Sequence, residues 1–186
     1  MSNFSVYFLL GLEHILNWAA VDHLLFILSL ACVYQPTDYK KLLWLITAFT
    51  LGHSVTLALA TLHIIEVNMK WVEFLIPCTI LFSAVYNLIK TKKRYKYGVV
   101  AFFGLIHGLG FSNYLQSLLG SESSLFTPLL GFNLGLEVGQ ICVVALVILT
   151  SFISYYVFHW KQKSYIKVIS GITIGLVLPM ILERWP

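Results

Sequence analysis

The residues of this chain that could do chemistry are histidines and carboxylates that lie inside long apolar stretches. Asp22 and His23 are adjacent in AAVDHLLFILSL, His53 lies in TAFTLGHSVTLAL, His107 in FFGLIHGLGF, and Glu137 in GFNLGLEVGQI. An acidic side chain at the centre of a lipid-facing helix costs about 2.5 to 3.5 kcal/mol, so such groups persist where they face one another or a polar ligand. This placement predicts a polar site inside a membrane.

The composition favours the same conclusion. The chain has 186 residues, of which 59% are hydrophobic and 11% are charged, and its mean hydropathy is +0.84. These values are typical of a polytopic membrane protein and leave no room for a separate soluble domain, so we expect a single transmembrane domain over residues 1–186. The three cysteines are odd in number and scattered, which favours packing thiols over a disulfide framework or a metal site.

Apolar windows of membrane-spanning length predict an all-α bundle of six transmembrane helices. The windows cover residues 5–33, 42–63, 71–90, 97–119, 126–158 and 165–183. Ten of the twelve lysines and arginines lie in or beside the first, third and fifth connections. The positive-inside rule therefore predicts a multi-pass protein of the cell inner (cytoplasmic) membrane with both termini outside. It also explains the net charge of +4 without nucleic-acid binding.

The depth of the polar residues suggests that they meet. At about 1.5 Å per residue, Asp22, His53, His107 and Glu137 each lie roughly 15 to 16 Å from one end of their predicted helices. In a hydrocarbon core about 30 Å thick, all four converge on the midplane.

The predicted fifth helix carries two amides beside its carboxylate. Asn133, Glu137 and Gln140 are spaced i, i+4 and i+7, which puts them on one helix face. Small residues at four-residue spacing predict close packing of the fourth, fifth and sixth helices. These residues are Gly104 and Gly108, then Gly131, Gly135 and Gly139, then Gly171 and Gly175.

His14 does not fit a straight first helix. It precedes Asp22 by about 80° around the axis and about 12 Å along it, and it lies nearly opposite His23. Three alternatives remain: His14 marks a separate outer vestibule, the helix is irregular between Leu16 and Val21, or Asp22 and His23 play different roles. In the last case Asp22 orients a histidine rather than contacting a metal.

Imidazoles with oxygen donors suit divalent nickel, cobalt, zinc or iron, while the lack of thiolates argues against monovalent copper. Magnesium and calcium fit less well because only two carboxylates lie at this depth. An enzyme is the alternative: three histidines around one open metal position can activate water, with Glu137 or Asp22 as the base. That would be an intramembrane metal-dependent hydrolase or lipid-modifying enzyme, although the chain contains no H-E-x-x-H motif.

The chain resembles the HupE/UreJ family in five ordered blocks that cover nearly its whole length. The blocks are GLEHILNWAAVDHLLFILSL, LITAFTLGHSVTLALA, EFLIPCTILFSAVYN, FFGLIHGLGFSNYL and FNLGLEVGQ. The resemblance implies a small membrane protein of six to seven spans, described as a nickel or cobalt permease associated with hydrogenase and urease maturation. The family's histidine-rich first block corresponds to His14, Asp22 and His23, and its later blocks contain His53, His107 and Glu137.

The leading hypothesis is therefore a permease that binds a divalent nickel, cobalt or zinc ion near the midplane. Its expected partners are the metal ion and the lipid bilayer, with self-association into a homo-oligomer left open. The hypothesis assigns His23, His53 and His107 as ligands, Glu137 as ligand or proton acceptor, Asp22 as orienting group, His14 as ligand at the entrance, and Asn133 and Gln140 as supporting donors.

Overall fold

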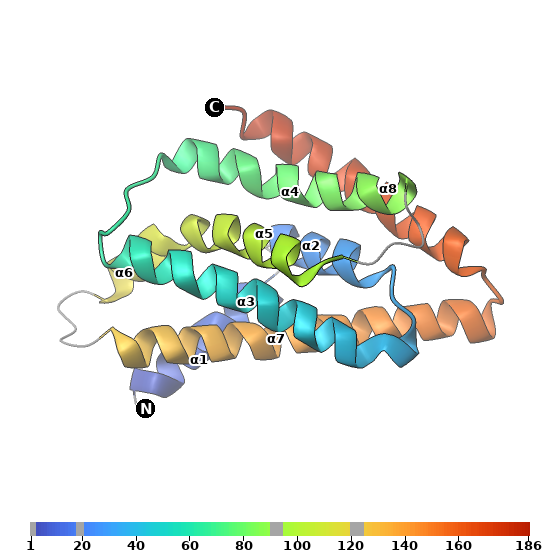
Figure 1. Cartoon of the computed structure of the whole chain (residues 1–186), viewed down its shortest axis with the longest axis horizontal. Coiled ribbons are helices and arrows are strands. Elements are labelled where there is room, and N and C mark those ends of the chain that lie inside the picture. The colour runs from blue at the N-terminus through green and yellow to red at the C-terminus, as the bar shows by residue number, and fades with distance from the viewer. Residues whose placement is uncertain (1–2, 18–20, 90–94, 120–124) are drawn as a thin grey trace.

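The computed structural model describes residues 3–17, 21–89, 95–119 and 125–186, and these fold almost entirely into helices (Figure 1). This confirms the predicted all-α class. The α-helices are α1 (Asn3–Leu16), α2 (Val21–Ala31), α3 (Tyr39–Thr61), α4 (Met69–Ile89), α5 (Tyr97–Gly110), α6 (Ser112–Leu119), α7 (Phe126–Phe152) and α8 (Gln162–Glu183). A short 3-10 turn, Pro36–Asp38, precedes α3, and a π-helical turn, Ile153–Val157, follows α7.

Four of the predicted spans are long helices, and two are broken. The helices α3, α4, α7 and α8 are each long and apolar enough to cross a membrane. The windows 5–33 and 97–119 are not continuous helices as predicted, because each contains two helices. The axes of α1 and α2 differ by 69° and those of α5 and α6 by 48°. If each bent pair forms one span, the described helices give six spans.

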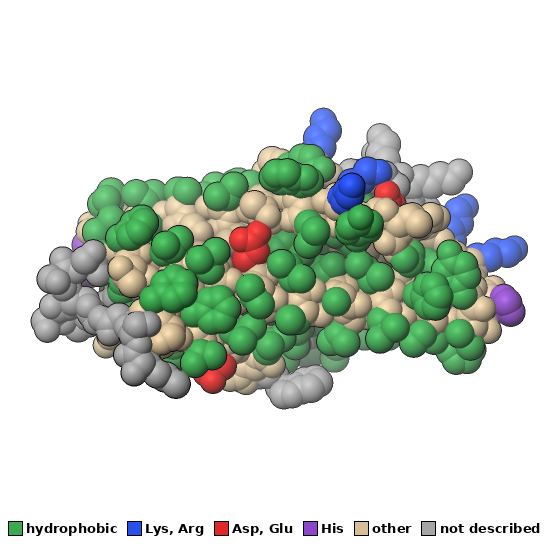
Figure 2. Space-filling view, turned by 90° about the horizontal axis from the view of Figure 1, so that it is seen from below, with side chains coloured by type: hydrophobic (Ala, Val, Ile, Leu, Met, Phe, Trp, Pro, Cys, Tyr) green, Lys and Arg blue, Asp and Glu red, His purple; other side chains and the backbone are tan. Residues whose placement is uncertain are grey.

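The helices pack mainly in three pairs, α1 with α7, α3 with α5, and α4 with α8, while α2 lies between α4 and α7 (Figure 1). The first two pairs run parallel and the third runs antiparallel. Figure 2 shows a largely apolar surface, with lysine and arginine side chains gathered at one end. The described basic residues of the first and fifth connections are Lys40, Lys41, Lys161 and Lys163. Four further basic residues of the third connection fall in 90–94, outside the described residues. The chain is a multi-pass membrane protein whose apolar exterior suits contact with lipid.

Glycines allow two of these pairs to approach closely. A Cβ added to Gly135 of α7 would overlap the backbone carbonyl oxygen of Phe8 in α1. A Cβ added to Gly104 of α5 would overlap the carbonyl oxygen of Phe49 in α3. Backbone contact of this kind is how small residues hold helices together in lipid, where van der Waals packing replaces hydrophobic expulsion.

The prediction that the last helix packs closely through its glycines is wrong. A Cβ at Gly171 or Gly175 of α8 would meet no atom within 4 Å. Four-residue spacing shows that two glycines share a face, but it does not show what that face contacts. In this fold, the partner of Gly131, Gly135 and Gly139 is α1, which has its own small residue at Gly11.

The substitution Gly135→Ala should destabilise the protein by about 1 to 3 kcal/mol, because the new methyl group would force α1 and α7 apart. Gly175→Ala is the matched control, and it should be neutral or slightly stabilising because alanine is the better helix former. Thermal unfolding of both variants in detergent measures the difference. Equal melting temperatures for the two variants would contradict the close α1–α7 packing.

Candidate metal centre

Three imidazoles meet inside the bundle. His14 lies near the end of α1, His23 near the start of α2 and His53 in the second half of α3. Each offers one ring nitrogen, and these three nitrogens lie within 4.8 Å of one another. The side chains of His23 and His53 are buried, at 4% and 0% exposure. The three residues, called here the histidine triad, could contact one ion together.

The break after α1 brings two members of the triad together. On a straight helix His14 and His23 would face opposite sides, but α1 ends at Leu16 and α2 begins at Val21. Because the two axes differ by 69°, the rings approach to a centroid distance of 4.5 Å. The structure thus has the irregular first helix that was one of the three alternatives. The expected separation of His14 as an entrance ligand is not what the structure shows.

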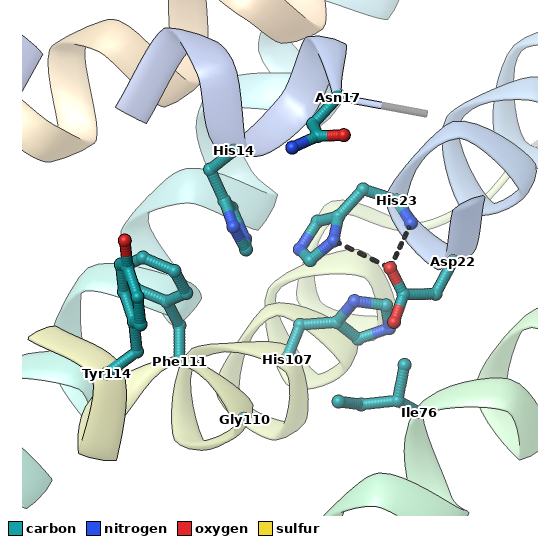
Figure 3. A pocket seen from close by; sticks show the side chains of 9 residues that line it. All are labelled: His14, Asn17, Asp22, His23, Ile76, His107, Gly110, Phe111 and Tyr114. Carbon is teal, nitrogen blue, oxygen red and sulfur yellow. Dashed lines mark hydrogen bonds and ion pairs between the residues drawn. The ribbon is translucent and has the colours of Figure 1, made fainter. Parts of the chain in front are cut away.

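Asp22 determines which nitrogen of His23 is free. Its Oδ1 accepts a hydrogen bond from the backbone N–H of His23 at 2.9 Å and lies 3.1 Å from His23 Nδ1 (Figure 3). A carboxylate only accepts hydrogen bonds, so Nδ1 carries the hydrogen and Nε2 keeps its lone pair. His23 Nε2 is buried and has no hydrogen-bond partner among the described residues. Asp22 therefore has the position of an orienting group, as hypothesised.

His107 of α5 borders the triad and has the opposite tautomer. Its Nε2 lies 3.0 Å from the hydroxyl of Thr79 in α4, and that hydroxyl donates to the carbonyl oxygen of Ile76 at 2.7 Å. A hydroxyl has one hydrogen, so here it accepts from Nε2–H, and the lone pair lies on Nδ1. The ring lies 5.2 Å from that of His23, yet it is not part of the group within 4.8 Å. A ligand role for His107 stays a prediction.

A cavity of about 380 Å³ adjoins the triad. In Figure 3, His14, His23 and His107 approach one another from three helices, beside the rings of Phe111 and Tyr114. Phe111 also packs against His14, with 4.2 Å between ring centroids. The residues that line the cavity are His14, Asn17, Asp22, His23, Ile76, His107, Gly110, Phe111 and Tyr114.

Glu137 is not part of the triad. Its Oε1 accepts a hydrogen bond of 2.6 Å from the hydroxyl of Thr47 in α3. Thr47 precedes His53 by six residues, or about 9 Å along the helix. Glu137 therefore meets α3 nearer to the start of that helix than His53 does, so the depths estimated from the sequence do not coincide in the structure. The prediction that Glu137 shares one site with the histidines is therefore not supported by this geometry.

The two amides have different surroundings. Gln140 accepts a hydrogen bond of 3.1 Å from the hydroxyl of Thr50, so it belongs with Glu137 at the contact of α3 and α7. Asn133 donates to the carbonyl oxygen of Leu129 at 2.8 Å, and its side chain lies beside His53. The Asn133 Oδ1 atom is buried without a hydrogen-bond partner among the described residues, which leaves one amide oxygen available next to the triad.

The site holds an unusual number of buried nitrogens without hydrogen-bond partners in the described part of the chain. Each such group costs about 1 to 3 kcal/mol unless a ligand or water satisfies it. The imidazole lone pairs of the triad, which converge from α1, α2 and α3, are suited to a divalent transition metal, which accepts them as ligands. The unpartnered atoms are His14 Nε2, His23 Nε2, both ring nitrogens of His53, and His107 Nδ1.

Two residues near the site were missed by sequence reasoning. Thr79 lies in the apolar run EFLIPCTILF, where a hydroxyl is a weak signal because it can bond to its own helix. Arg184 follows α8 and lies 3.5 Å from Asp22. As a charge at the end of a predicted span, it is indistinguishable from a topology signal.

Replacing Thr79 with valine should remove the hydrogen bond that fixes the tautomer of His107, and it leaves every nitrogen of the triad in place. In the parent protein we expect hydrogen on Nε2 of His107 and on Nδ1 of His23. Nitrogen NMR of ¹⁵N-labelled histidine in the metal-free protein distinguishes the two forms. The variant should shift the signals of His107 and leave those of His23 unchanged, whereas identical spectra would contradict the hydrogen bond.

Comparison with known proteins agrees with the resemblance seen in the five sequence blocks. A protein-family model described as "HupE / UreJ protein" matches residues 1–185, essentially the whole chain. Searches of curated proteins and of solved structures found no match. All five blocks lie within the matched region, and the residues of the triad lie in the first two of them. The chain belongs to the HupE/UreJ family.

Proposed function

We propose that this protein is a permease for a divalent transition metal, nickel or cobalt, in the cell inner membrane. The cargo ion binds the histidine triad and passes toward the end of the bundle that carries the basic connections. The observation that supports this function most directly is the convergence of three buried imidazole nitrogens, within 4.8 Å, from three different helices. Family membership supports the same class of cargo.

The donor set favours a transition metal over a hard cation. Imidazole suits nickel, cobalt and zinc, whereas magnesium and calcium require several oxygen ligands. Among the described residues, Asp22 is the one carboxylate that lines the cavity. Its Oδ1 is already engaged with His23, so it raises the basicity of that imidazole rather than adding an oxygen shell.

The two helix breaks also support transport. The break between α1 and α2 positions His14 and His23, and residues at the break between α5 and α6, Gly110 and Phe111, line the same cavity. Irregular backbone is tolerated at membrane depth where it lines a cavity, and broken helices carry the binding sites of many transporters. Both broken spans therefore turn at the point where the cargo would bind.

Polar side chains also lie between the triad and the basic end of the bundle. Thr50 and Thr47 follow His53 along α3 in that direction, and they bond to Gln140 and Glu137 of α7. An ion that leaves the triad would meet hydroxyl, amide and carboxylate oxygens next. A hydrolase would instead need a free base beside the metal, but Glu137 bonds to Thr47 and Asp22 is held by His23 and Arg184. This arrangement favours the permease over the enzyme.

Removal of one triad ligand tests the function. His53→Ala should weaken nickel binding by more than about 100-fold, because loss of a ligand costs more than loss of a hydrogen-bond partner of a ligand. The same variant should abolish nickel uptake into proteoliposomes. His63→Ala is the matched control, because His63 is an exposed histidine just after the same helix, and it should behave as the parent. Stoichiometric zinc that resists chelation, with no uptake of nickel or cobalt, would contradict the proposal.

The charge of Asp22 can be tested separately from its shape. Asp22→Asn keeps an oxygen that accepts from His23 Nδ1 but removes the negative charge, so nickel affinity should fall by about 10- to 100-fold. Asp38→Asn, at a carboxylate that pairs with Lys41 on the surface, serves as the control. Isothermal titration calorimetry of the purified proteins measures both. Equal affinities for Asp22→Asn and the parent would show that Asp22 does not support a ligand.

A further inference from the structure

A cation of the protein itself contacts the carboxylate beside the triad. Nη1 of Arg184 lies 3.5 Å from Oδ2 of Asp22, while Oδ1 of the same carboxylate bonds to His23. The side chains of Asp22 and Arg184 are 16% and 31% exposed, so the pair is largely shielded. Each oxygen of Asp22 thus has its own partner, an imidazole on one side and a guanidinium on the other.

The end of α8 positions Arg184 beside Asp22. It directly follows α8, and its backbone N–H donates to the carbonyl oxygen of Met180 at 3.0 Å. The next residue, Trp185, packs edge-on against Phe74 of α4, with 5.1 Å between ring centroids. Helix α8 also contacts α2, the helix that carries Asp22. The backbone of Arg184 is therefore anchored by α8 before it and by Trp185 after it, and its guanidinium pairs with Asp22.

We propose that Arg184 is a built-in competitor of the cargo cation. It neutralises Asp22 while the triad is empty and withdraws when a divalent cation binds His14, His23 and His53. This inference rests on the proposed function. An arginine beside the site repels a divalent ion and reduces the charge by which Asp22 strengthens His23 as a ligand. Arg184 thereby lowers affinity and speeds release, which a transport site requires.

The first test separates charge from packing. In Arg184→Gln, calorimetry should show nickel bound on the order of tenfold more tightly than by the parent, a typical coupling between two sites. The initial uptake rate at saturating nickel should fall, because the ion leaves more slowly. Arg184→Lys keeps the charge and should stay within about threefold of the parent. Lys70→Gln, which removes an exposed charge at the start of α4, is the control and should change neither value.

The second test follows the withdrawal directly. The chain has two arginines, Arg94 and Arg184, so an Arg94→Lys background leaves Arg184 as the single target for phenylglyoxal. Modification detected by mass spectrometry should become faster when nickel is added. The same background with His53→Ala should show no such change, because the triad is then incomplete.

The outcomes distinguish this inference from the function on which it rests. If the parent binds nickel and His53→Ala does not, but Arg184→Gln binds no more tightly at an unchanged melting temperature, the competitor role is overturned and the permease stands. An unchanged rate of phenylglyoxal modification upon nickel binding would overturn it as well. If the parent binds no nickel or cobalt, both proposals fail together.

Discussion

The site depends on one constraint: two histidines nine positions apart cannot face the same point from a straight helix. The turn between α1 and α2 removes this constraint and brings the rings of His14 and His23 to 4.5 Å. The turn is useful only if α1 is held in place, and the backbone contacts of Gly11 and Gly135 hold it against α7. The same logic applies to α5, where Gly104 sets the distance to α3 and therefore the place of His107 relative to His53.

Hydrogen bonds then decide what each imidazole can offer. Asp22 keeps Nε2 of His23 free, and Thr79 keeps Nδ1 of His107 free. These partners lie on different helices, so the orientation of the ring nitrogens depends on the packing of α2 and of α4 against the centre. Arg184 connects α8 to the same carboxylate. Binding or release of an ion at the triad would thus affect α4 and α8, which do not themselves contribute a triad histidine.

Much of the fold could be predicted from the sequence, because hydropathy over about 20 residues reflects the thickness of the membrane directly. The site could be predicted only in part. Residue depth along a helix correctly suggested that His23 and His53 meet, but it does not give the tilt or the offset of one helix against another, and so it grouped Glu137 with them. The break after Leu16 depends on backbone geometry that hydropathy does not encode. Arg184 could not be assigned because it meets Asp22 only through the packing of α8.

The central claim is that one divalent ion binds three imidazoles at the junction of α1, α2 and α3. X-ray absorption spectroscopy of the purified protein loaded with one equivalent of zinc tests this claim most directly, because zinc ligands have well-separated distances. The account predicts a first shell with three imidazole nitrogens at about 2.0 to 2.1 Å and no sulfur scatterer near 2.3 Å. A shell with one imidazole or none, or one that contains sulfur from a cysteine, would contradict it.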